Sequence, residues 1–154
     1  MNHYVKILLL PLTVAVVLLA CTSAPQFSDV QNKDWHLIEV RTKPEIDFNR
    51  SKLAEEGFGE IFTLRFEAER VNGVAAPNRF FAPYEQGKNQ ALTIKPIAGT
   101  LMAPLREPEK LKEKDYFTYL QNTSKWNLAG GNLELHSKTG NGTEVILVFA
   151  PAAK

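Results

Sequence analysis

Side chains that could carry covalent or metal chemistry are few and widely spaced in this sequence. The single cysteine, Cys21, has no second cysteine in the chain with which to form a disulfide. His36 and His136 fall on different predicted strands, without the clustered ligands that a metal site needs. No G-x-S-x-G segment is present, and the carboxylates of Glu55-Glu56 and Glu60 lack the apolar surroundings of a glycosidase acid. We therefore expect a protein that is not an enzyme and that holds no metal or cofactor.

The thiol of Cys21 is the one group whose surroundings predict a specific chemistry. Residues 1–20 contain a single Lys or Arg and no Asp or Glu, and Ile7 to Leu19 is a mostly apolar run. That run is shorter than the roughly 20 residues of a membrane-spanning helix, as is typical of a signal peptide. The sequence Leu18-Leu19-Ala20-Cys21 resembles a bacterial lipobox, in which cleavage follows the small residue and the cysteine thiol accepts a diacylglycerol.

These features predict a lipoprotein signal peptide at residues 1–20, cleavage between Ala20 and Cys21, and lipid attachment at Cys21. A plain secretory signal followed by a chance cysteine is the alternative. Two or three acyl chains would anchor the protein stably, because each buried methylene contributes about 0.8 kcal/mol. Thr22 follows the cysteine. By resemblance to Gram-negative lipoproteins, a residue other than Asp at this place favours the outer membrane, with the membrane face left open.

Beyond the signal peptide the charges balance. The chain has 18 Lys and Arg residues, of which Lys6 lies in the signal peptide, so 17 basic residues remain against 17 Asp and Glu. A neutral surface argues against nucleic acid, which needs a basic footprint, and against a polybasic membrane patch. Residues 21–33 are mostly polar and small, so we expect a flexible tether that reaches about 20 Å. The expected partners are the membrane, through the N-terminal lipid, and an envelope protein, with the chain itself monomeric.

Alternation of apolar and polar residues predicts strands in the first half of the remaining chain. Trp35 to Arg41 is the expected first strand, with either Leu37 or Ile38 in the core. Lys43 to Gly59 is expected to be a loop, in which Ser51 to Glu56 could form a helical turn closed by a glycine. Further along the chain, the apolar residues of this alternation are Phe62, Leu64, Phe66, Leu92 and Ile94.

The second half predicts a hairpin, one helix and a three-stranded meander. The hairpin pairs Arg79 to Tyr84 with Ala91 to Lys95, and Ile97 to Ala103 is a further extended piece. Pro108 suits the first position of a helix, which we expect to run to Asn122 with an apolar stripe packed on the sheet. The meander turns at two glycine-containing sites. Its elements are Trp126 to Ala129, Leu133 with Leu135, and Val145 with Leu147 and Phe149.

The middle of the chain contains a set of residues in a characteristic order and spacing, Gly73, Asn78, Phe80, Tyr84, Thr100 and Met102, the last two within the run Ile97 to Ala103. This set resembles the META domain, the module of HslJ-like heat-shock lipoproteins. The resemblance extends over about residues 34–150, leaving 151–154 as a C-terminal tail. It implies a mainly β (α+β) fold, a strongly twisted, barrel-like antiparallel sheet with one α-helix packed on it. It also implies a role in stress or drug tolerance.

The resemblance bears on the position of one turn and on a disulfide found in relatives with paired cysteines. Asn72-Gly73 alone predicts a hairpin turn, whereas the family places the turn near Ala68 to Arg70 and leaves Gly73 in the next strand, where a bulge is possible. We favour the second interpretation. Many members carry a cysteine before the Asn and another after the Met-Ala, where this chain has Pro77 and Pro104. The joint loss is expected if those cysteines form a disulfide.

Two functions remain open at this point. The motif residues predict structural roles, with Asn78 bonded to backbone at a turn, and the leading hypothesis is a non-enzymatic binding protein of the envelope. The alternative is a carrier of a small apolar ligand, because curled β-sheets can enclose a cavity. An enclosed apolar pocket would favour the carrier, and an exposed aromatic patch would favour protein binding. Convergent titratable groups would instead indicate an enzyme.

Overall fold

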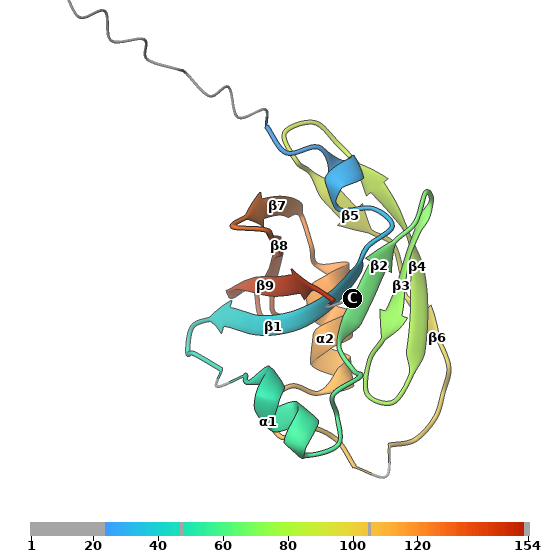
Figure 1. Cartoon of the computed structure of the whole chain (residues 1–154), viewed down its shortest axis with the longest axis vertical. Coiled ribbons are helices and arrows are strands. Elements are labelled where there is room, and N and C mark those ends of the chain that lie inside the picture. Colours follow the sequence, from blue (N-terminus) through green and yellow to red (C-terminus); the bar gives the residue numbers. More distant parts are fainter. Residues whose placement is uncertain (1–23, 47, 105, 153–154) are drawn as a thin grey trace, which may run out of the picture.

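The computed structural model describes residues 24–46, 48–104 and 106–152 (Figure 1). The predicted signal peptide, with Ala20 and Cys21, lies outside the described residues. In chain order the elements are η1 (Phe27–Asp29), β1 (Asp34–Thr42), α1 (Arg50–Glu55), β2 (Thr63–Phe66), β3 (Arg70–Val74), β4 (Arg79–Gln86), β5 (Leu92–Ile94), β6 (Ala98–Gly99), α2 (Glu113–Gln121), β7 (Lys125–Ala129), β8 (Asn132–Lys138) and β9 (Glu144–Pro151).

The strands form one antiparallel sheet that curls until its two ends nearly meet. Their order is β5-β4-β3-β2-β1-β9-β8-β7, and β6 pairs with β4 beside this path. At the two ends the Leu92 N–H donates to Ser124 O at 3.1 Å and the Trp126 N–H donates to Gln90 O at 3.0 Å. Helix α2 packs against β5 and β8. The predicted mainly β, barrel-like fold with a packed helix is therefore confirmed, as are the β4–β5 hairpin and the β7–β8–β9 meander.

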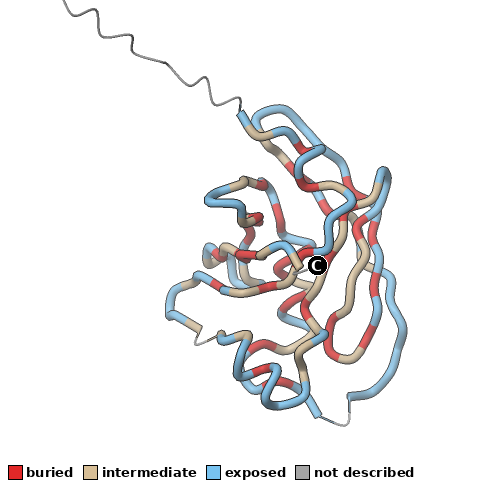
Figure 2. Tube along the Cα trace, in the orientation of Figure 1, coloured by how far each residue is buried: buried red, intermediate tan, exposed pale blue. Residues whose placement is uncertain are grey.

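Aromatic side chains fill the interior of this barrel. At the end where the chain enters, the ring of Phe27 lies 5.2 Å from that of Phe66 and 5.2 Å from that of Trp126. Further along, Tyr116 of α2 is 0% exposed and packs against Phe62 at a centroid distance of 5.0 Å. Buried residues follow the strands and helices all around the barrel (Figure 2). Because such rings bury large apolar areas in preferred edge and tilted contacts, they dominate the core.

A β-bulge in β1 decides between the two candidate core positions at its centre. Leu37 is 0% exposed, whereas Ile38 is only half-buried. The register between β1 and β9 shifts between Leu37 and Glu39, so one extra residue is accommodated there. As a result Leu37 and Val40, three residues apart, both face the core.

The flexible tether was expected at residues 21–33, but the described part of this segment, residues 24–33, packs on the barrel. Phe27 and Val30 are 7% and 0% exposed. The Trp35 Nε1–H donates to Val30 O at 3.0 Å, and the Asn32 N–H donates to Phe66 O at 2.8 Å. Two apolar residues suffice to hold this segment, and they are too few to produce a periodic pattern.

The long helix begins later than predicted, at Glu113 instead of Pro108. Pro108 is buried and Leu111 is 1% exposed, so their burial fixes the preceding segment in a non-helical path. Lys112 has an extended backbone, with φ −86° and ψ 153°. The predicted apolar stripe is present on the shorter helix, where Tyr116 and Leu120 are both 0% exposed.

The segment predicted as a loop at Lys43 to Gly59 contains the short helix α1. Asn49 caps its start, because its Oδ1 accepts from the backbone N–H groups of Ser51 at 2.9 Å and Lys52 at 3.2 Å. Gly57 follows its end at φ +85°, a left-handed conformation that glycine adopts without a Cβ penalty. The helical turn considered from the sequence is therefore real and starts one residue earlier.

The turn between β2 and β3 lies where the family resemblance places it. The Glu67 N–H donates to Arg70 O at 2.8 Å, and Gly73 stands within β3. Gly73 pairs with Phe80 of β4 in a regular register, so no bulge occurs at this position. A Cβ placed on Gly73 would lie 2.0 Å from the Thr63 carbonyl oxygen and 2.8 Å from the Phe80 ring. Glycine is thus required by close packing and not by a turn.

We predict that Gly73→Ala lowers the free energy of unfolding by at least about 2 kcal/mol, because the added methyl overlaps backbone as well as a ring. Urea denaturation monitored by Trp fluorescence measures this loss. Gly140→Ala is the matched control, since no atom lies within 4 Å of the corresponding Cβ. Equal stability of the two variants would show that the strands can separate at Gly73 without cost.

Candidate functional site

The side chain of Asn78 joins two other motif residues, Thr100 and Met102, to the start of α2. Its Oδ1 accepts from the Thr100 hydroxyl at 2.7 Å and from the Met102 backbone N–H at 2.8 Å. Its Nδ2 donates to Met102 O at 3.1 Å and to Glu113 Oε2 at 2.8 Å, while its backbone N–H donates to Glu113 Oε1 at 3.1 Å. The residue is 4% exposed. Because both amide protons and both lone pairs of Oδ1 are used, this side chain has no group left for a ligand.

The Asn78 network ties together the two segments that a disulfide would join in relatives with the paired cysteines. Pro77 precedes Asn78, and Pro104 lies two residues beyond Met102. In this chain, hydrogen bonds hold the loop that follows β6 to the start of β4. The same network fixes the first residue of α2, because Glu113 accepts both remaining donors of Asn78.

The other motif residues lie apart from this network. Gly73 of β3 is half-buried and pairs with Phe80 of β4, whose side chain lies in the core. Tyr84 lies near the end of the barrel where the chain enters. Its hydroxyl donates to Glu67 O at 2.6 Å and accepts from Gln31 Nε2 at 2.8 Å. The six motif residues therefore do not converge on one site.

The loop held by Asn78 carries exposed apolar side chains. Among the described residues, the large hydrophobic side chains that are exposed are Leu101 at 100%, Met102 at 54% and Phe81 at 49%. Phe81 lies on β4 opposite Ala98 of β6, and Leu101 and Met102 follow β6 directly. We call these three residues the motif surface. Their common origin in β4 and the adjoining loop distinguishes them from the scattered single exposures of an ordinary surface.

A hollow of about 420 Å³ adjoins Phe81 on the outer side of β3 and β4. The side chain of Arg79 lines it and makes no ion pair within the described part of the chain. A second hollow of about 570 Å³ shares Arg79 and Asn72 with the first and extends to His36. The two hollows are therefore neighbours on the surface, and the guanidinium of Arg79 lies beside both.

His36 of the second hollow lies beside Arg50, whose guanidinium joins two elements of the fold. The Arg50 guanidinium donates to Ile61 O at 2.7 Å and Leu37 O at 3.3 Å, and its Nη2 lies 3.2 Å from His36 Nδ1. Burial lowers the pKa of His36, and the positive charge of Arg50 lowers it further. These bonds join α1 to β1. In residues 24–46, 48–104 and 106–152, no group of three His, Cys, Asp or Glu side chains could hold a metal ion.

The aromatic core argues against a carrier that would hold its ligand inside the barrel. Phe27, Tyr84 and Trp126 occupy one end of the barrel, and Phe62, Phe80 and Tyr116 the other. The hollows described above open on the outer surface instead of the barrel axis. A carrier in which the ligand occupies the interior would have to displace these rings.

Sequence reasoning identified Asn78, Thr100 and Met102 but missed Glu113, which completes the network, and the exposure of Leu101. Glu113 stands in a run of mixed charges, Glu107 to Asp115, and such a run is typical of a solvated helix face. Leu101 was grouped with its apolar neighbours in the motif. The segment Gly99 to Leu101 shows neither the period of a strand nor that of a helix. This lack of a period was the signal in the sequence that the segment is a surface loop. No helix among the described residues has the length and apolar character needed to cross a membrane.

Comparison with known proteins gives a family and a fold. A family model described as META domain matches residues 28–151. The comparison with curated proteins gave no match. The NMR structure of a protein from Burkholderia xenovorans superimposes with a TM-score of 0.59 at 18% identity, covering 96% of this chain and 100% of that one. A DUF4847 family protein from Bacteroides vulgatus gives a TM-score of 0.54 at 14% identity, covering 80% and 95%. At these identities the two structures show a common fold and nothing about function.

Proposed function

Because this chain belongs to the META domain family, we propose that it is a lipid-anchored protein of the bacterial envelope that binds a protein partner through the motif surface and is not an enzyme. The observation that carries the proposal is the exposure of Leu101, Met102 and Phe81 on a loop and strand held in place by a saturated buried amide. A role in envelope stress tolerance, as the family resemblance implies, would be exercised through this binding.

Rigid presentation supports binding at the motif surface. An apolar side chain on a loose loop can fold back onto its own protein, whereas Met102 is bonded to Asn78 through both its N–H and its carbonyl oxygen. The side chains of Leu101 and Met102 are thereby kept in solvent, where their burial by a partner yields about 25 cal/mol per Å² of apolar area. Preorganisation of this kind reduces the entropy lost on association.

The position of the anchor supports a partner that lies away from the membrane. From Cys21 to Phe27 the chain has six residue steps, which span at most about 20 Å when extended. Phe27 packs at the end of the barrel beside the β4–β5 hairpin, whereas the loop after β6 runs along the opposite end (Figure 1). A lipid on Cys21 would therefore hold the first end near the bilayer and turn the motif surface away from it.

The proposal is tested by crosslinking and copurification from intact cells. Wild-type protein should recover a recurrent envelope protein, and the double variant Leu101→Glu, Met102→Gln should recover at least about tenfold less, because a central apolar anchor contributes 2 kcal/mol or more. Lys88→Glu, on the exposed β4–β5 turn, is the matched control and should recover the wild-type amount. An unchanged partner in the double variant would contradict binding at the motif surface.

A further inference from the structure

The edge of the sheet at β6 is open to solvent. β6 pairs with the first half of β4, and the Thr100 N–H continues this ladder by donating to Arg79 O at 3.0 Å. Successive residues of an antiparallel ladder point their backbone groups to opposite sides, so those of Gly99 and Leu101 point away from β4. Residues 98–104 are all exposed. Within the described part of the chain, these outward N–H and C=O groups have no hydrogen-bond partner.

This open edge lacks the features that usually protect a strand from pairing. Natural proteins block an edge with charged side chains, proline or a covering element, because free backbone groups recruit other strands. Residues 97–103 include no charged residue and no proline, although Pro96 and Pro104 flank them. The far end of this segment is held in place, since both backbone groups of Met102 bond to Asn78. The edge is therefore unprotected and also preorganised.

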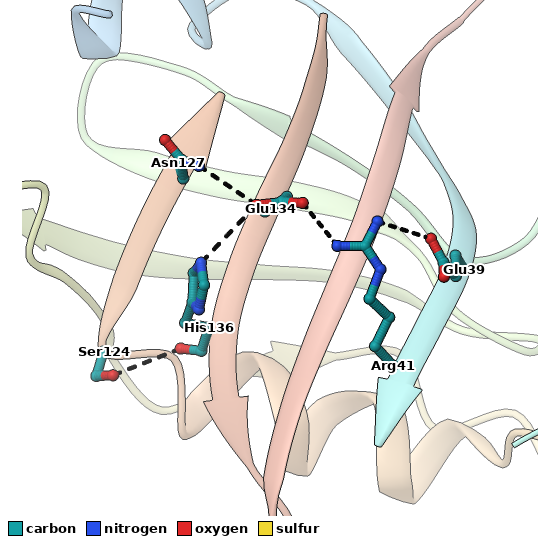
Figure 3. A network of polar contacts seen from close by, with 6 residues as sticks. All are labelled: Glu39, Arg41, Ser124, Asn127, Glu134 and His136. Atoms are coloured by element: carbon teal, nitrogen blue, oxygen red, sulfur yellow. Dashed lines mark hydrogen bonds and ion pairs between the residues drawn. The ribbon is translucent and has the colours of Figure 1, made fainter. Parts of the chain in front are cut away.

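Other parts of the sheet surface use their polar groups internally. Where β5 approaches β7, the Leu92 N–H donates to Ser124 O at 3.1 Å. On the outer face of β1, β9 and β8, the Arg41 guanidinium contacts Glu39 Oε2 at 3.0 Å and Glu134 Oε1 at 2.8 Å (Figure 3). These groups already have partners within the chain, in contrast to the backbone groups that β6 presents.

Arg79 supplies an uncompensated positive charge beside this edge. It makes no ion pair within the described residues. His36 is neutral near pH 7, because burial lowers its pKa. The other charged side chains in and around the two hollows have neighbours of opposite charge: Asp34 with Arg65 at 3.1 Å, Arg70 with Glu67 at 2.9 Å, and Glu60 with Arg50, where its charge opposes the lowering of the Arg50 pKa by burial.

The position of Arg79 distinguishes between two occupants of the edge. Arg79, Gly99 and Thr100 line the same hollow, so a side chain from a strand added at the edge can extend over Thr100 towards Arg79. A second copy of this chain would bring no carboxylate there, because its own residues 97–103 are uncharged. A strand that carries a carboxylate would complement both the backbone groups and the charge.

We propose that the partner protein binds by strand addition at the edge of β6. An extended segment of the partner pairs with the outward backbone groups of Gly99 and Leu101, as in other cases where a peptide adds a strand to an exposed sheet edge. Its apolar side chains cover Leu101 and Met102, and an Asp or Glu of the segment pairs with Arg79. This inference rests on the proposed function, because it describes how the partner of the motif surface is held.

Hydrogen exchange of the full chain in phosphatidylcholine nanodiscs tests strand addition, with the capped peptide Val-Thr-Val-Glu-Val-Thr-Val as the probe. At saturation the probe should slow amide exchange within residues 97–103 at least about tenfold, because free N–H groups become donors, and leave the exposed turn at residues 87–90 unchanged. The control peptide carries N-methyl groups on the central Glu and on the next Val, one for each of its edges. It should bind at least about tenfold more weakly, because both edges lose a donor.

Arg79→Gln tests the charge. It should weaken binding of the probe about threefold and leave unchanged the binding of a peptide with Gln in place of the Glu, as expected for one exposed ion pair. Lys88→Gln, on the exposed β4–β5 turn, is the matched control and should alter neither peptide. Both side chains are exposed, so thermal unfolding of the two variants should match that of the wild type.

The inference is overturned if the probe leaves exchange of residues 97–103 unchanged, if the N-methylated peptide protects them equally, or if Arg79→Gln binds the probe with wild-type affinity. These results can be separated from the test of the proposed function. A partner recovered in cells without protection by the probe would mean that side chains alone hold it, which overturns strand addition. Protection by the probe without any partner in cells would support strand addition and contradict the proposed function.

Discussion

Asn78→Ala is expected to lower the free energy of unfolding by about 3 kcal/mol, because leaving buried donors and acceptors unpaired costs about 1–3 kcal/mol per group. The substitution removes the partner of the Thr100 hydroxyl, of both backbone groups of Met102 and of one Glu113 oxygen. Some of these groups can then reach water, which keeps the expected loss below the sum of the individual costs. Urea denaturation of variant and wild type measures the difference.

Two comparisons make this result specific to the network. Asn127→Ala removes one hydrogen bond at the sheet surface, to Glu134 at 3.3 Å, and should cost less than about 1 kcal/mol. Asn78→Asp should be at least as destabilising as the alanine variant, since it replaces the donor by a carboxylate 2.8 Å from Glu113. Limited proteolysis within residues 98–104 should accelerate in both Asn78 variants. A loss under 1 kcal/mol in Asn78→Ala would show that the loop is held by other contacts.

Cys21→Ala is expected to move the protein from the membrane fraction to the aqueous fraction, or to leave it as an unprocessed form with residues 1–20 attached. The reason is that, in the proposed function, two or three acyl chains provide the anchor, and each buried methylene would contribute about 0.8 kcal/mol. The described residues offer no helix that could replace it. Cell fractionation together with intact-protein mass measures both location and the added lipid.

The surface variant Leu101→Glu, Met102→Gln provides the matched control, because it alters the exposed apolar residues and leaves Cys21 unchanged. It should stay in the membrane fraction and keep the added mass of the lipid, so that its mass differs from that of the lipidated wild type only by the two substitutions. If Cys21→Ala has the wild-type distribution, and if the mass difference equals that of the single substitution, then Cys21 is not lipidated and the anchor must be sought elsewhere.

Much of the barrel could be predicted because its strands bury one face. The inward residues Phe62, Leu64 and Phe66 are each at most 1% exposed, as their alternation with polar neighbours indicates. The β7–β8–β9 meander could be predicted for the same reason, because its inward leucines alternate with polar residues and glycines mark its turns. Within β1, however, alternation could not choose between Leu37 and Ile38, because a bulge depends on the register with β9, which is set by a strand far along the chain.

The departures from prediction arise where long-range burial overrides local pattern. Phe27 and Val30 join the core although their neighbours are polar, and Leu111 delays the start of α2 although Pro108 suits a helix. In the candidate site, family resemblance located Asn78, but one of its four amide contacts is to Glu113, which is 35 residues away in sequence. Contacts between residues far apart in sequence also decide whether an apolar loop residue such as Leu101 is buried or exposed. The spacing of apolar residues along the sequence does not reveal these contacts.

Residue-specific crosslinking tests the central claim most directly. A photoreactive amino acid would replace Leu101 in one lipidated protein and Lys88 in another, and both would be irradiated in intact cells. Partner binding at the motif surface predicts one recurrent protein adduct from position 101, lost when Cys21→Ala is added, and no such adduct from position 88. Adducts of the same proteins from both positions, or none from position 101, would contradict a binding function for this surface.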